Sequence, residues 1–493
     1  MVGLWSHACP FGRIVLFMRL RMFLANLGHH RLLTPLVSPP MGIMYLAAYL
    51  RTRFDLDIQL ANQRESNCTN EELARQAIDF EADIVGFGSL TPSGHGFAPL
   101  TQMVRAGLPK ALILLGGPHV SSFGARVLAD TAANAAVKDE GELAFEQVLH
   151  AHFDGGDLAR IPGLIWRAPD GQVLTNPGTM PPIENLDSLP LPAYELIDLP
   201  KYWRLQSMPP LPWRRYVSLL SSRGCPYHCN WCHRIFGKKF RVHSPERIVD
   251  EIEHFQRIYG VDDFEFLDDI FNLDRSRVTA ICELLHRRNL RIKIAFPNGI
   301  RTDILTQEDV DALADAGTYF SSFALESGSP RIQKLMGKNL NIPRFLQGVE
   351  MAVKRRIFAN GFVMLGFPTE SEAEMQQTID VASNSMLHTA SFFTATPYPN
   401  TDLYEHVAKN HPQQLASLTY KDTDYSLIPV NLSDVPDEVL FACQRKANWQ
   451  FFRNPKRIYR ILRDYPQPHL LPLYIPTYLA RLTKGLLGSA KAA

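Results

Sequence analysis

Cys225-Pro226-Tyr227-His228-Cys229-Asn230-Trp231-Cys232 is the stretch that decides how this chain is read, because it holds three of the chain's seven cysteines. Three thiolates this close can bind one face of a metal or an iron–sulfur cluster and leave one coordination position open. An open position indicates chemistry rather than a structural role. Two plainer interpretations are a structural zinc site, for which the spacing is wrong and a fourth cysteine is missing, or a chance group of buried thiols. We favour an iron–sulfur cluster.

The composition is that of an ordinary globular protein. A length of 493 residues allows about three domains. Hydrophobic residues make up 46% and charged residues 20%, and the formal net charge is +1. This balance argues against bulk attraction to nucleic acid, and we expect no nucleic-acid partner. The other cysteines are scattered singly, which fits a reducing compartment, so we expect a cytoplasmic protein. They are Cys9, Cys68, Cys282 and Cys443.

The first residues contain a short apolar run from Ile14 to Met18. It is too short to span a bilayer, and no clear signal-peptide cleavage pattern follows it. We expect residues 1–20 to form an extension before the first strand.

From Met22 onward, short apolar runs alternate with amphipathic stretches, which is typical of βαβ units. Glycine-rich turns follow several of the runs, at the end of a parallel strand where such sheets hold ligands. We therefore expect a doubly wound α/β domain over residues 21–154. The expected strands are 22–26, 56–60, 83–89, 112–115 and 135–137, and the main helices are 41–53 and 71–80.

Residues 155–213 are predicted to hold a small hairpin and a connector. The hairpin turns at Pro169-Asp170-Gly171. The connector is rich in proline but too apolar for a free linker, so we expect it to pack between domains.

Residues 214–402 repeat a strand–helix order six times, which predicts a partial (β/α)6 barrel open on one side. The cysteine loop leaves the carboxyl end of the first strand, the face where such barrels keep their chemistry. Residues 403–493 are expected to be helical. The predicted barrel strands are 216–221, 263–269, 291–296, 319–325, 358–365 and 390–396.

The pattern Cys-x3-Cys-x2-Cys, with Trp231 before the last cysteine, resembles the cluster loop of radical S-adenosylmethionine (SAM) enzymes. The resemblance implies that Cys225, Cys229 and Cys232 bind three irons of a 4Fe–4S cluster, while SAM chelates the fourth. It also implies that Trp231 helps to enclose the adenine, and that the cluster reduces SAM to release a 5′-deoxyadenosyl radical.

The resemblance also assigns polar groups at the strand ends to SAM, which needs acceptors for its ammonium and donors for its carboxylate. Asp268 or Asp269 is expected near the ammonium. Arg301 is expected to pair with the carboxylate, because a guanidinium offers a bidentate fork.

Glu326 and Ser327 lie where the family contacts ribose, and the turn Gly366-Phe367-Pro368 lies where backbone approaches adenine. Taken singly, each such residue has a plainer interpretation as a solvated cap or an ion pair. These residues taken together support a SAM site more strongly than any one of them does alone.

The first domain, placed before such a core, resembles the cobalamin-binding domain of one class of that family. Taken alone, its glycines could merely permit tight turns, and no Gly-x-Gly-x-x-Gly pattern favours a dinucleotide. No Asp-x-His-x-x-Gly occurs, so we expect His119 to be a loop residue near the corrin rather than a metal ligand. The matching stretches are Ser38-Pro39-Pro40-Met41-Gly42, Gly86-Phe87-Gly88-Ser89, Gly116-Gly117-Pro118-His119 and Glu140-Gly141-Glu142. The cobalamin contacts expected from them are Gly88, Ser89, Gly117, His119 and Glu140.

The resemblance implies a cobalamin-dependent radical SAM enzyme, which we expect to be a methyltransferase acting at an unactivated carbon. The radical would take hydrogen from the substrate and methylcobalamin would give its methyl group. The alternatives are a non-methylating cyclase or rearrangement enzyme of the same class and, from another class, a non-catalytic iron–sulfur or cobalamin sensor. In a sensor, His228 or His233 would supply a fourth ligand to the cluster.

The expected partners are a small-molecule or lipid-like substrate and an electron donor of the flavodoxin or ferredoxin type. Near the C-terminus, residues 451–463 and 479–487 mix bulky apolar and basic side chains. This mixture fits either a packed helix with a solvated basic face or a peripheral contact with a membrane.

Overall fold

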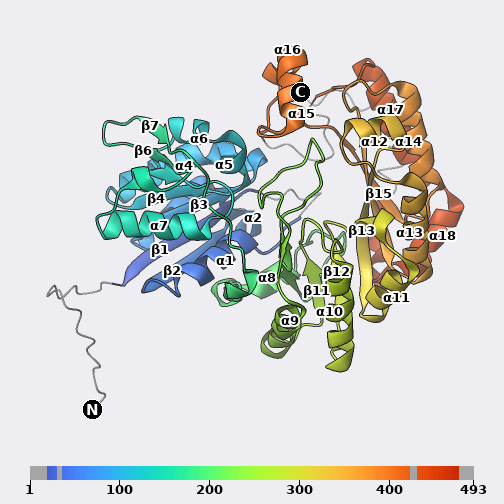
Figure 1. Cartoon of the computed structure of the whole chain (residues 1–493), viewed down its shortest axis with the longest axis horizontal. Coiled ribbons are helices and arrows are strands. Elements are labelled where there is room, and N and C mark those ends of the chain that lie inside the picture. The colour runs from blue at the N-terminus through green and yellow to red at the C-terminus, as the bar shows by residue number, and fades with distance from the viewer. Residues whose placement is uncertain (1–18, 30–35, 422–429, 477–493) are drawn as a thin grey trace.

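The computed structural model describes residues 19–29, 36–421 and 430–476 of the chain. Two sheet-containing parts lie side by side (Figure 1): an N-terminal part, blue to teal, and a barrel-like part, green to red. Most of the predicted N-terminal extension and the apolar stretch 479–487 lie outside the described residues.

The N-terminal part is built on a sheet in the order β2-β1-β3-β4-β5-β6-β7. Its first five strands are parallel, as predicted from the βαβ pattern. They are β1 (Leu20–Leu27), β2 (Leu56–Asn62), β3 (Ile84–Ser89), β4 (Leu112–Gly116) and β5 (Ala135–Ala136).

Helices cover both faces of this sheet because successive side chains of a strand point to opposite sides. On β1, Met22 and Leu24 belong to one buried cluster, while Phe23 and Ala25 belong to another. The doubly wound prediction is therefore confirmed. The helices are α1 (Met41–Leu50), α2 (Gln63–Ser66), α3 (Asn70–Asp79), α4 (Phe97–Gly107), α5 (Pro118–Phe123), α6 (Arg126–Ala129) and α7 (Glu142–Phe153).

The predicted hairpin consists of β6 (Ile165–Arg167) and β7 (Val173–Thr175). Its turn is closed by a 2.8 Å hydrogen bond from the Gly171 amide to the Ala168 carbonyl oxygen. β6 pairs antiparallel with β5, so the sheet continues beyond residue 154.

The connector crosses from one part to the other and is held to both parts by hydrogen bonds. Tyr194 lies fully buried, and its hydroxyl donates to the Ser218 carbonyl oxygen at 2.7 Å. The Tyr202 hydroxyl accepts a 3.1 Å hydrogen bond from Asn62 of the N-terminal sheet. Its one α-helix is α8 (Leu199–Trp203).

The second part is an all-parallel sheet in the order β15-β14-β13-β12-β11-β8. Among the described residues no ladder joins β8 to β15, so the barrel is partial, as predicted. Its strands are β8 (Tyr216–Leu219), β11 (Asp263–Phe266), β12 (Lys293–Phe296), β13 (Thr318–Glu326), β14 (Phe358–Leu365) and β15 (Thr389–Thr394).

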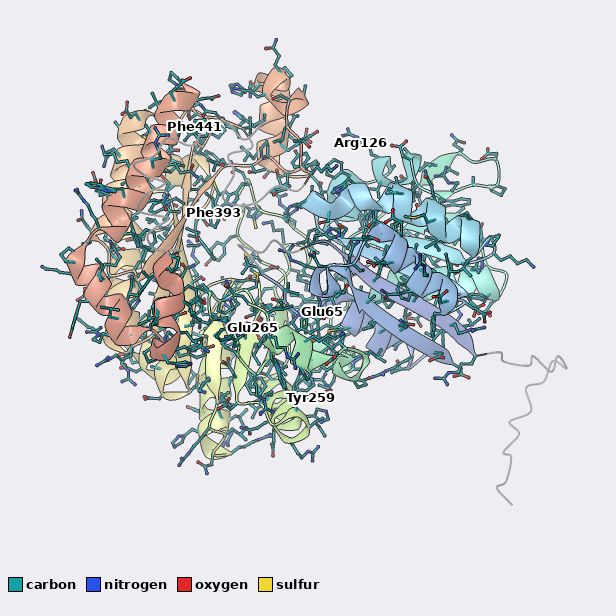
Figure 2. The ribbon with its side chains drawn as sticks, turned by 180° about the vertical axis from the view of Figure 1, so that it is seen from behind. Glu65, Arg126, Tyr259, Glu265, Phe393 and Phe441 are labelled. Carbon is teal, nitrogen blue, oxygen red and sulfur yellow. The ribbon has the colours of Figure 1, made fainter. Side chains whose placement is uncertain are left out.

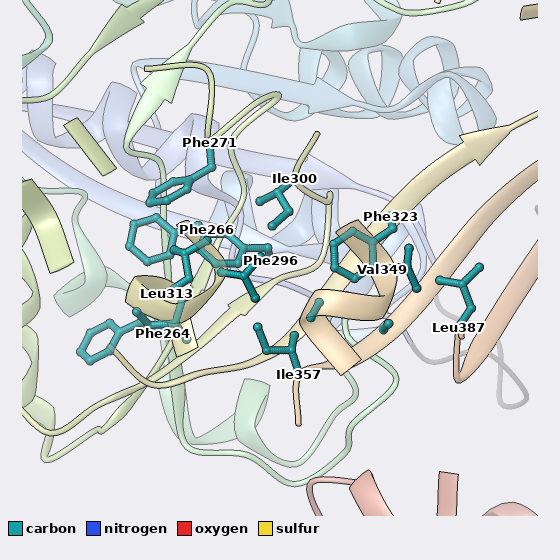
Figure 3. Close-up of a cluster of buried hydrophobic side chains, with 14 of the residues drawn as sticks. Phe264, Phe266, Phe271, Phe296, Ile300, Leu313, Phe323, Val349, Ile357 and Leu387 are labelled. Atoms are coloured by element: carbon teal, nitrogen blue, oxygen red, sulfur yellow. The ribbon is translucent and has the colours of Figure 1, made fainter. Parts of the chain in front are cut away.

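Helices wrap the outside of this barrel, and apolar side chains fill the layer between helices and strands. Phe266, Phe271 and Phe296 pack with ring centroids 4.6–5.6 Å apart (Figure 3). The helices that follow the barrel strands are α9 (Pro245–Tyr259), α10 (Arg275–Arg287), α11 (Gln307–Asp315), α12 (Pro330–Leu335), α13 (Ile342–Lys354) and α14 (Glu372–Asn384).

The C-terminal region is helical, as predicted, but its basic residues do not all face solvent. Arg457 is completely buried and donates to the backbone oxygens of Leu387 and Phe451 at 2.9 and 2.5 Å. The expected solvated basic face therefore does not include this residue, which belongs to the packed side. None of the helices in the described residues is long and apolar enough to cross a membrane. The helices are α15 (Asp402–Asn410), α16 (Pro412–Ala416), α17 (Asp437–Phe452) and α18 (Pro455–Asp464).

Candidate functional site

The cysteine loop leaves β8 and is closed at its base by a short antiparallel ribbon. β9 (Ser222–Arg223) pairs with β10 (Arg241–Val242), so Arg223 and Arg241 lie opposite each other. The Cys225 amide donates to the Gly237 carbonyl oxygen at 3.3 Å, inside this loop. The ribbon therefore fixes where the loop starts and ends.

The three thiols lie close enough to affect one another. Burial raises the pKa of all three, that of Cys232 to about 12, and the Cys229 and Cys225 thiols add to the shift at Cys232. Cys232 is nevertheless accessible to solvent. Bound iron would displace the protons that these thiols otherwise keep.

The three thiols stay the predicted ligands of an iron–sulfur cluster. Within the described part of the chain, no group of three or more His, Cys, Asp or Glu side chains is close enough to hold one metal ion. A cluster spreads its thiolate ligands over several irons, so it needs convergent but more widely spaced thiols.

Two lysines that sequence reasoning missed flank the thiols. The Lys238 ammonium donates to the Tyr227 carbonyl oxygen and lowers the pKa of Cys225 against the effect of burial. Lys338, which is far from the cysteine loop in sequence, likewise lowers the pKa of the Cys229 thiol against the effect of burial. Lys238 is in the loop itself, whereas Lys338 follows α12, and neither belongs to a recognisable spacing.

The two carboxylates after β11 have different environments. Asp268 is buried and accepts hydrogen bonds from the Ser221 hydroxyl at 2.7 Å and from the Ser222 hydroxyl. Burial and the neighbouring Asp268 raise the pKa of Asp269 to about 6. Asp268 therefore holds the start of the cysteine loop, and Asp269 stays the predicted partner of the SAM ammonium.

Arg301 lies near the cysteines but has protein partners. Its guanidinium sits 3.8 Å from the Tyr227 ring centroid and 2.8 Å from Asp303 Oδ1. The charge of Arg301 also reaches Cys225 and Cys229, where it lowers the pKa of each thiol. Arg301 thus lies beside the cysteine loop and is held by Asp303, and its pairing with the SAM carboxylate stays a prediction.

Glu326 and Ser327 point in different directions from the end of β13. Glu326 has a positive φ of 59° and forms a 3.2 Å ion pair with Lys338. Ser327 is fully buried, and its hydroxyl lies 3.2 Å from that of Thr378. Glu326 therefore lies near the cysteine loop, whereas the Ser327 hydroxyl is hydrogen-bonded within the protein.

The turn after β14 packs on the cysteine loop. The Phe367 ring lies edge-on to Trp231 with centroids 6.4 Å apart, between Gly366 and Pro368 of the expected adenine turn. The buried Glu370 carboxylate accepts hydrogen bonds from the amides of Gly366 and Phe367 at 2.7 and 3.0 Å. Glu370, which sequence reasoning missed, fixes this turn.

Gly88 and Gly117 lie at the carboxyl ends of β3 and β4, the edge where parallel sheets of this kind hold ligands in a crevice. Gly117 has φ +84°, and a Cβ there would lie 3.1 Å from the Ser89 amide nitrogen. A Cβ at Gly88 would meet nothing closer than 3.9 Å. The backbone is thus open to a flat ligand at Gly88, and Gly117 permits the close turn. The Ser89 hydroxyl itself donates to the Leu90 carbonyl oxygen at 2.7 Å.

His119 is held by aromatic packing. Its ring centroid lies 4.6 Å from that of Phe123 and 5.8 Å from that of Phe97. Burial and the nearby His95 lower the pKa of His119 to about 4, so the imidazole is neutral at pH 7. A Cβ on Gly94 would overlap this ring. His119 is therefore a residue of α5 rather than of a loop, and its place near the corrin stays a prediction.

The crevice faces the cysteine loop across the junction between the two parts. Ser122 Oγ of α5 lies 3.4 Å from Nδ1 of His233, the residue after the third cysteine. Asn400, after β15, donates to the Ser121 carbonyl oxygen at 3.3 Å. Glu140, expected to contact cobalamin, instead directs its carboxylate to Arg223 and Arg241.

Comparisons with known proteins identify both parts. The model of the radical SAM superfamily matches residues 219–382, and the model of the B12 binding domain matches residues 34–149. An uncharacterized methyltransferase of Pyrococcus horikoshii is 30% identical over 424 residues, which cover 85% of this chain and 89% of that protein. The chain belongs to the cobalamin-dependent radical SAM enzymes.

Two further proteins show the range of this family. An anaerobic magnesium-protoporphyrin IX monomethyl ester cyclase of Rubrivivax gelatinosus is 25% identical over 374 residues, covering 74% of this chain and 66% of the cyclase. The radical SAM methyltransferase TsrM from Kitasatospora setae, solved with tryptophan and a SAM analogue, shares the fold with a TM-score of 0.67. It is 18% identical, and the match covers 80% of this chain and 76% of TsrM.

Proposed function

We propose that this enzyme methylates an unactivated carbon of a small-molecule substrate. The observation that carries the proposal is the contact between α5 and His233, which sets the glycine-lined crevice of the B12 binding domain against the cysteine loop. A carbon between the two sites would be within reach of both. The name of the Pyrococcus relative and that of TsrM support methyl transfer.

When bound, the cluster supplies an electron, SAM supplies a 5′-deoxyadenosyl radical and cobalamin supplies the methyl group. Cys225, Cys229 and Cys232 would hold the cluster. Gly88 and Gly117 would let the corrin approach the backbone. The chain's own part is to position these groups and to exclude water from them.

Each of several residues around the thiols would bind a different part of SAM. Asp269 would accept from the ammonium, and Arg301 would donate to the carboxylate as a guanidinium fork. Trp231 and the Gly366–Pro368 turn would enclose the adenine, with Glu370 keeping that turn in place. Glu326, paired with Lys338, would meet the ribose.

A cyclase or rearrangement enzyme of the same class is the closest alternative, and the Rubrivivax relative favours it. The products separate the two. After anaerobic reconstitution and incubation with candidate substrates, equal amounts of S-adenosylhomocysteine and 5′-deoxyadenosine support methylation. Formation of 5′-deoxyadenosine alone, with a substrate that is consumed, would overturn it.

A non-catalytic sensor would need a fourth protein ligand for the cluster. His228 is exposed, and His233 already contacts Ser122 and packs at a tilt against Tyr398 with ring centroids 5.0 Å apart. Electron paramagnetic resonance with and without SAM tests this alternative. A cluster signal that SAM leaves unchanged would favour the sensor.

We further propose a cytoplasmic location and an electron donor of the flavodoxin or ferredoxin type. The C-terminal surface favours a peripheral membrane contact, which would suit a lipid-like substrate. Four large apolar side chains are more than half exposed there, among basic residues of α18. They are Tyr459, Leu462, Leu473 and Ile475.

A further inference from the structure

The two arginines at the base of the cysteine loop bind the same segment of the B12 binding domain. Arg223 donates to Glu140 Oε2 at 2.8 Å and to Glu142 Oε1 at 2.7 Å. Arg241 donates to the same Glu140 carboxylate, at 3.1 Å from Nη1 to Oε2. Because Arg223 and Arg241 are paired across the β9–β10 ribbon, both strands of the loop's base are held by one segment.

This cluster of charges is buried. The exposed fractions are 4% and 2% for the side chains of Arg223 and Arg241, and 8% and 6% for those of Glu140 and Glu142. Arg241 also donates to the Ile183 carbonyl oxygen of the connector at 2.6 Å. A buried ion pair contributes little net stability compared with apolar packing, but breaking one side of it is costly. Such a pair therefore fixes a relative position more than it adds stability.

These ion pairs lie between the two predicted cofactor sites. Glu140 lies between β5 and α7, and Glu142 is the first residue of α7. β5 pairs directly with β4, the strand that leads into Gly117. Arg223 is two residues before Cys225. A shift at these ion pairs would move the glycine crevice relative to the thiols.

We propose that Glu140, Glu142, Arg223 and Arg241 form an interdomain clamp that sets the spacing between the cysteine loop and the cobalamin crevice. They act as positioning residues, through the loop and the crevice rather than by touching the reacting atoms. This inference rests on the proposed methyl transfer, because only a reaction that uses both cofactors requires that spacing.

The variant Glu140→Gln tests the clamp. The amide can still accept from one arginine, but its NH2 group then opposes the other. The control is Glu265→Gln, which breaks a buried 2.8 Å ion pair with Arg214 inside the barrel (Glu265 is labelled in Figure 2). Both substitutions remove one buried carboxylate from an arginine that keeps a second one, Glu142 for Arg223 and Asp263 for Arg214. Only Glu140 lies at the junction.

Amide hydrogen exchange of the purified protein gives a readout that needs no turnover. In Glu140→Gln we expect residues 139–142 and the ribbon residues 222–223 and 241–242 to exchange about tenfold faster together. In Glu265→Gln these segments should keep the wild-type rate. Unchanged exchange of the ribbon in Glu140→Gln would overturn the clamp.

Turnover gives the second readout. We expect Glu140→Gln to form 5′-deoxyadenosine at near the wild-type rate, while methylated product per 5′-deoxyadenosine falls about tenfold or more. Arg241→Gln removes the arginine partner of the same contact and should give the same loss of methylated product per 5′-deoxyadenosine. The double variant should lose no more than either single one, because both remove one interaction.

The outcomes separate the clamp from the proposed function. If the wild-type enzyme forms no methylated product, the proposed function fails, and hydrogen exchange still tests the clamp. If the wild-type enzyme methylates and the product ratio in Glu140→Gln stays within about twofold of wild type, the clamp fails alone.

Discussion

The carboxylate of Asp268 accepts a 2.7 Å hydrogen bond from the hydroxyl of Ser221, so the end of β11 is tied to the residue from which the cysteine loop departs. The Ser221 amide donates to the same carboxylate at 3.2 Å. Asp269, one residue further on, is turned toward the loop instead, where Gly224 and Lys238 stabilise its ionised form. Asp268 thus has a structural task, while Asp269 stays the predicted ligand-binding carboxylate.

The substitutions Asp268→Asn and Asp269→Asn should therefore have different effects. Asp268→Asn would set an amide NH2 group against the Ser221 amide, so we expect the free energy of unfolding to fall by about 1–3 kcal/mol. The Asp269→Asn variant should unfold like wild type but bind SAM about tenfold more weakly, because a charge-assisted hydrogen bond is lost. Chemical denaturation and calorimetric titration with SAM measure the two effects. Equal loss of SAM affinity in both variants would contradict this division.

Replacing any of Cys225, Cys229 or Cys232 with alanine should abolish cluster assembly, because two thiolates cannot hold the site against water. Iron and sulfide analysis after anaerobic reconstitution measures this. Cobalamin retention should persist, since the B12 binding domain keeps its own core. Cys68→Ala, a half-buried thiol of the first domain, is the control and should keep its iron content. Full iron content in a loop variant would refute the ligand assignment.

Glu370 should make stability fall as pH rises. Burial raises the pKa of this carboxyl from 4.5 to about 7, so between these values the folded protein keeps a proton that the unfolded chain releases. The contribution is present below pH 4.5 and is lost as pH rises through 7, by up to about 3 kcal/mol. Glu370→Gln lacks this proton and should gain stability relative to wild type across that interval.

Thermal and denaturant unfolding of both proteins from acid to neutral pH checks this sign. Glu251 is another buried carboxyl with its pKa raised to about 7, and it contributes equally to both proteins. The difference between them therefore isolates Glu370. A difference that stays constant with pH would show that Glu370 keeps an ordinary pKa.

His119→Ala should leave the absorption bands of bound cobalamin in place, because the ring is held between Phe97 and Phe123 and is not assigned to the metal. Cobalamin retention should weaken, since the packing against α5 is lost. Gly94→Ala, which displaces the same ring, should have the same effect. A shift of the bands in His119→Ala would identify the imidazole as an axial ligand.

The double variant Tyr459→Ser/Leu462→Ser tests membrane contact. These side chains are 65% and 57% exposed, and burying two of this size in a lipid interface contributes enough for about a tenfold change in binding. Sedimentation with vesicles of anionic phospholipid should show that loss. Ile258→Ser, 56% exposed on α9, is the control and should bind like wild type. Equal binding by all three proteins would overturn the membrane proposal.

The sequence alone determined the fold class and the nature of the first cofactor. The hydrophobic periods of the strands and helices are local, and so is the spacing of Cys225, Cys229 and Cys232 within one loop. The six barrel strands and the five parallel strands before them are therefore found where the pattern predicts them. The hairpin was also predicted, but not that it pairs with β5, because strand pairing depends on contacts across the sheet.

Only the tertiary structure decided what the polar residues do. Asp268 and Asp269 are indistinguishable in sequence, and their side chains differ because one points at Ser221 and the other toward the loop. Glu140 was expected at the corrin, yet it meets Arg223, 83 residues away in the chain. Ion pairs form between whatever groups the packed elements bring together, and no local spacing encodes that distance. The sequence motifs thus indicate which cofactors the enzyme uses, and the tertiary contacts determine how the two cofactor sites are positioned relative to each other.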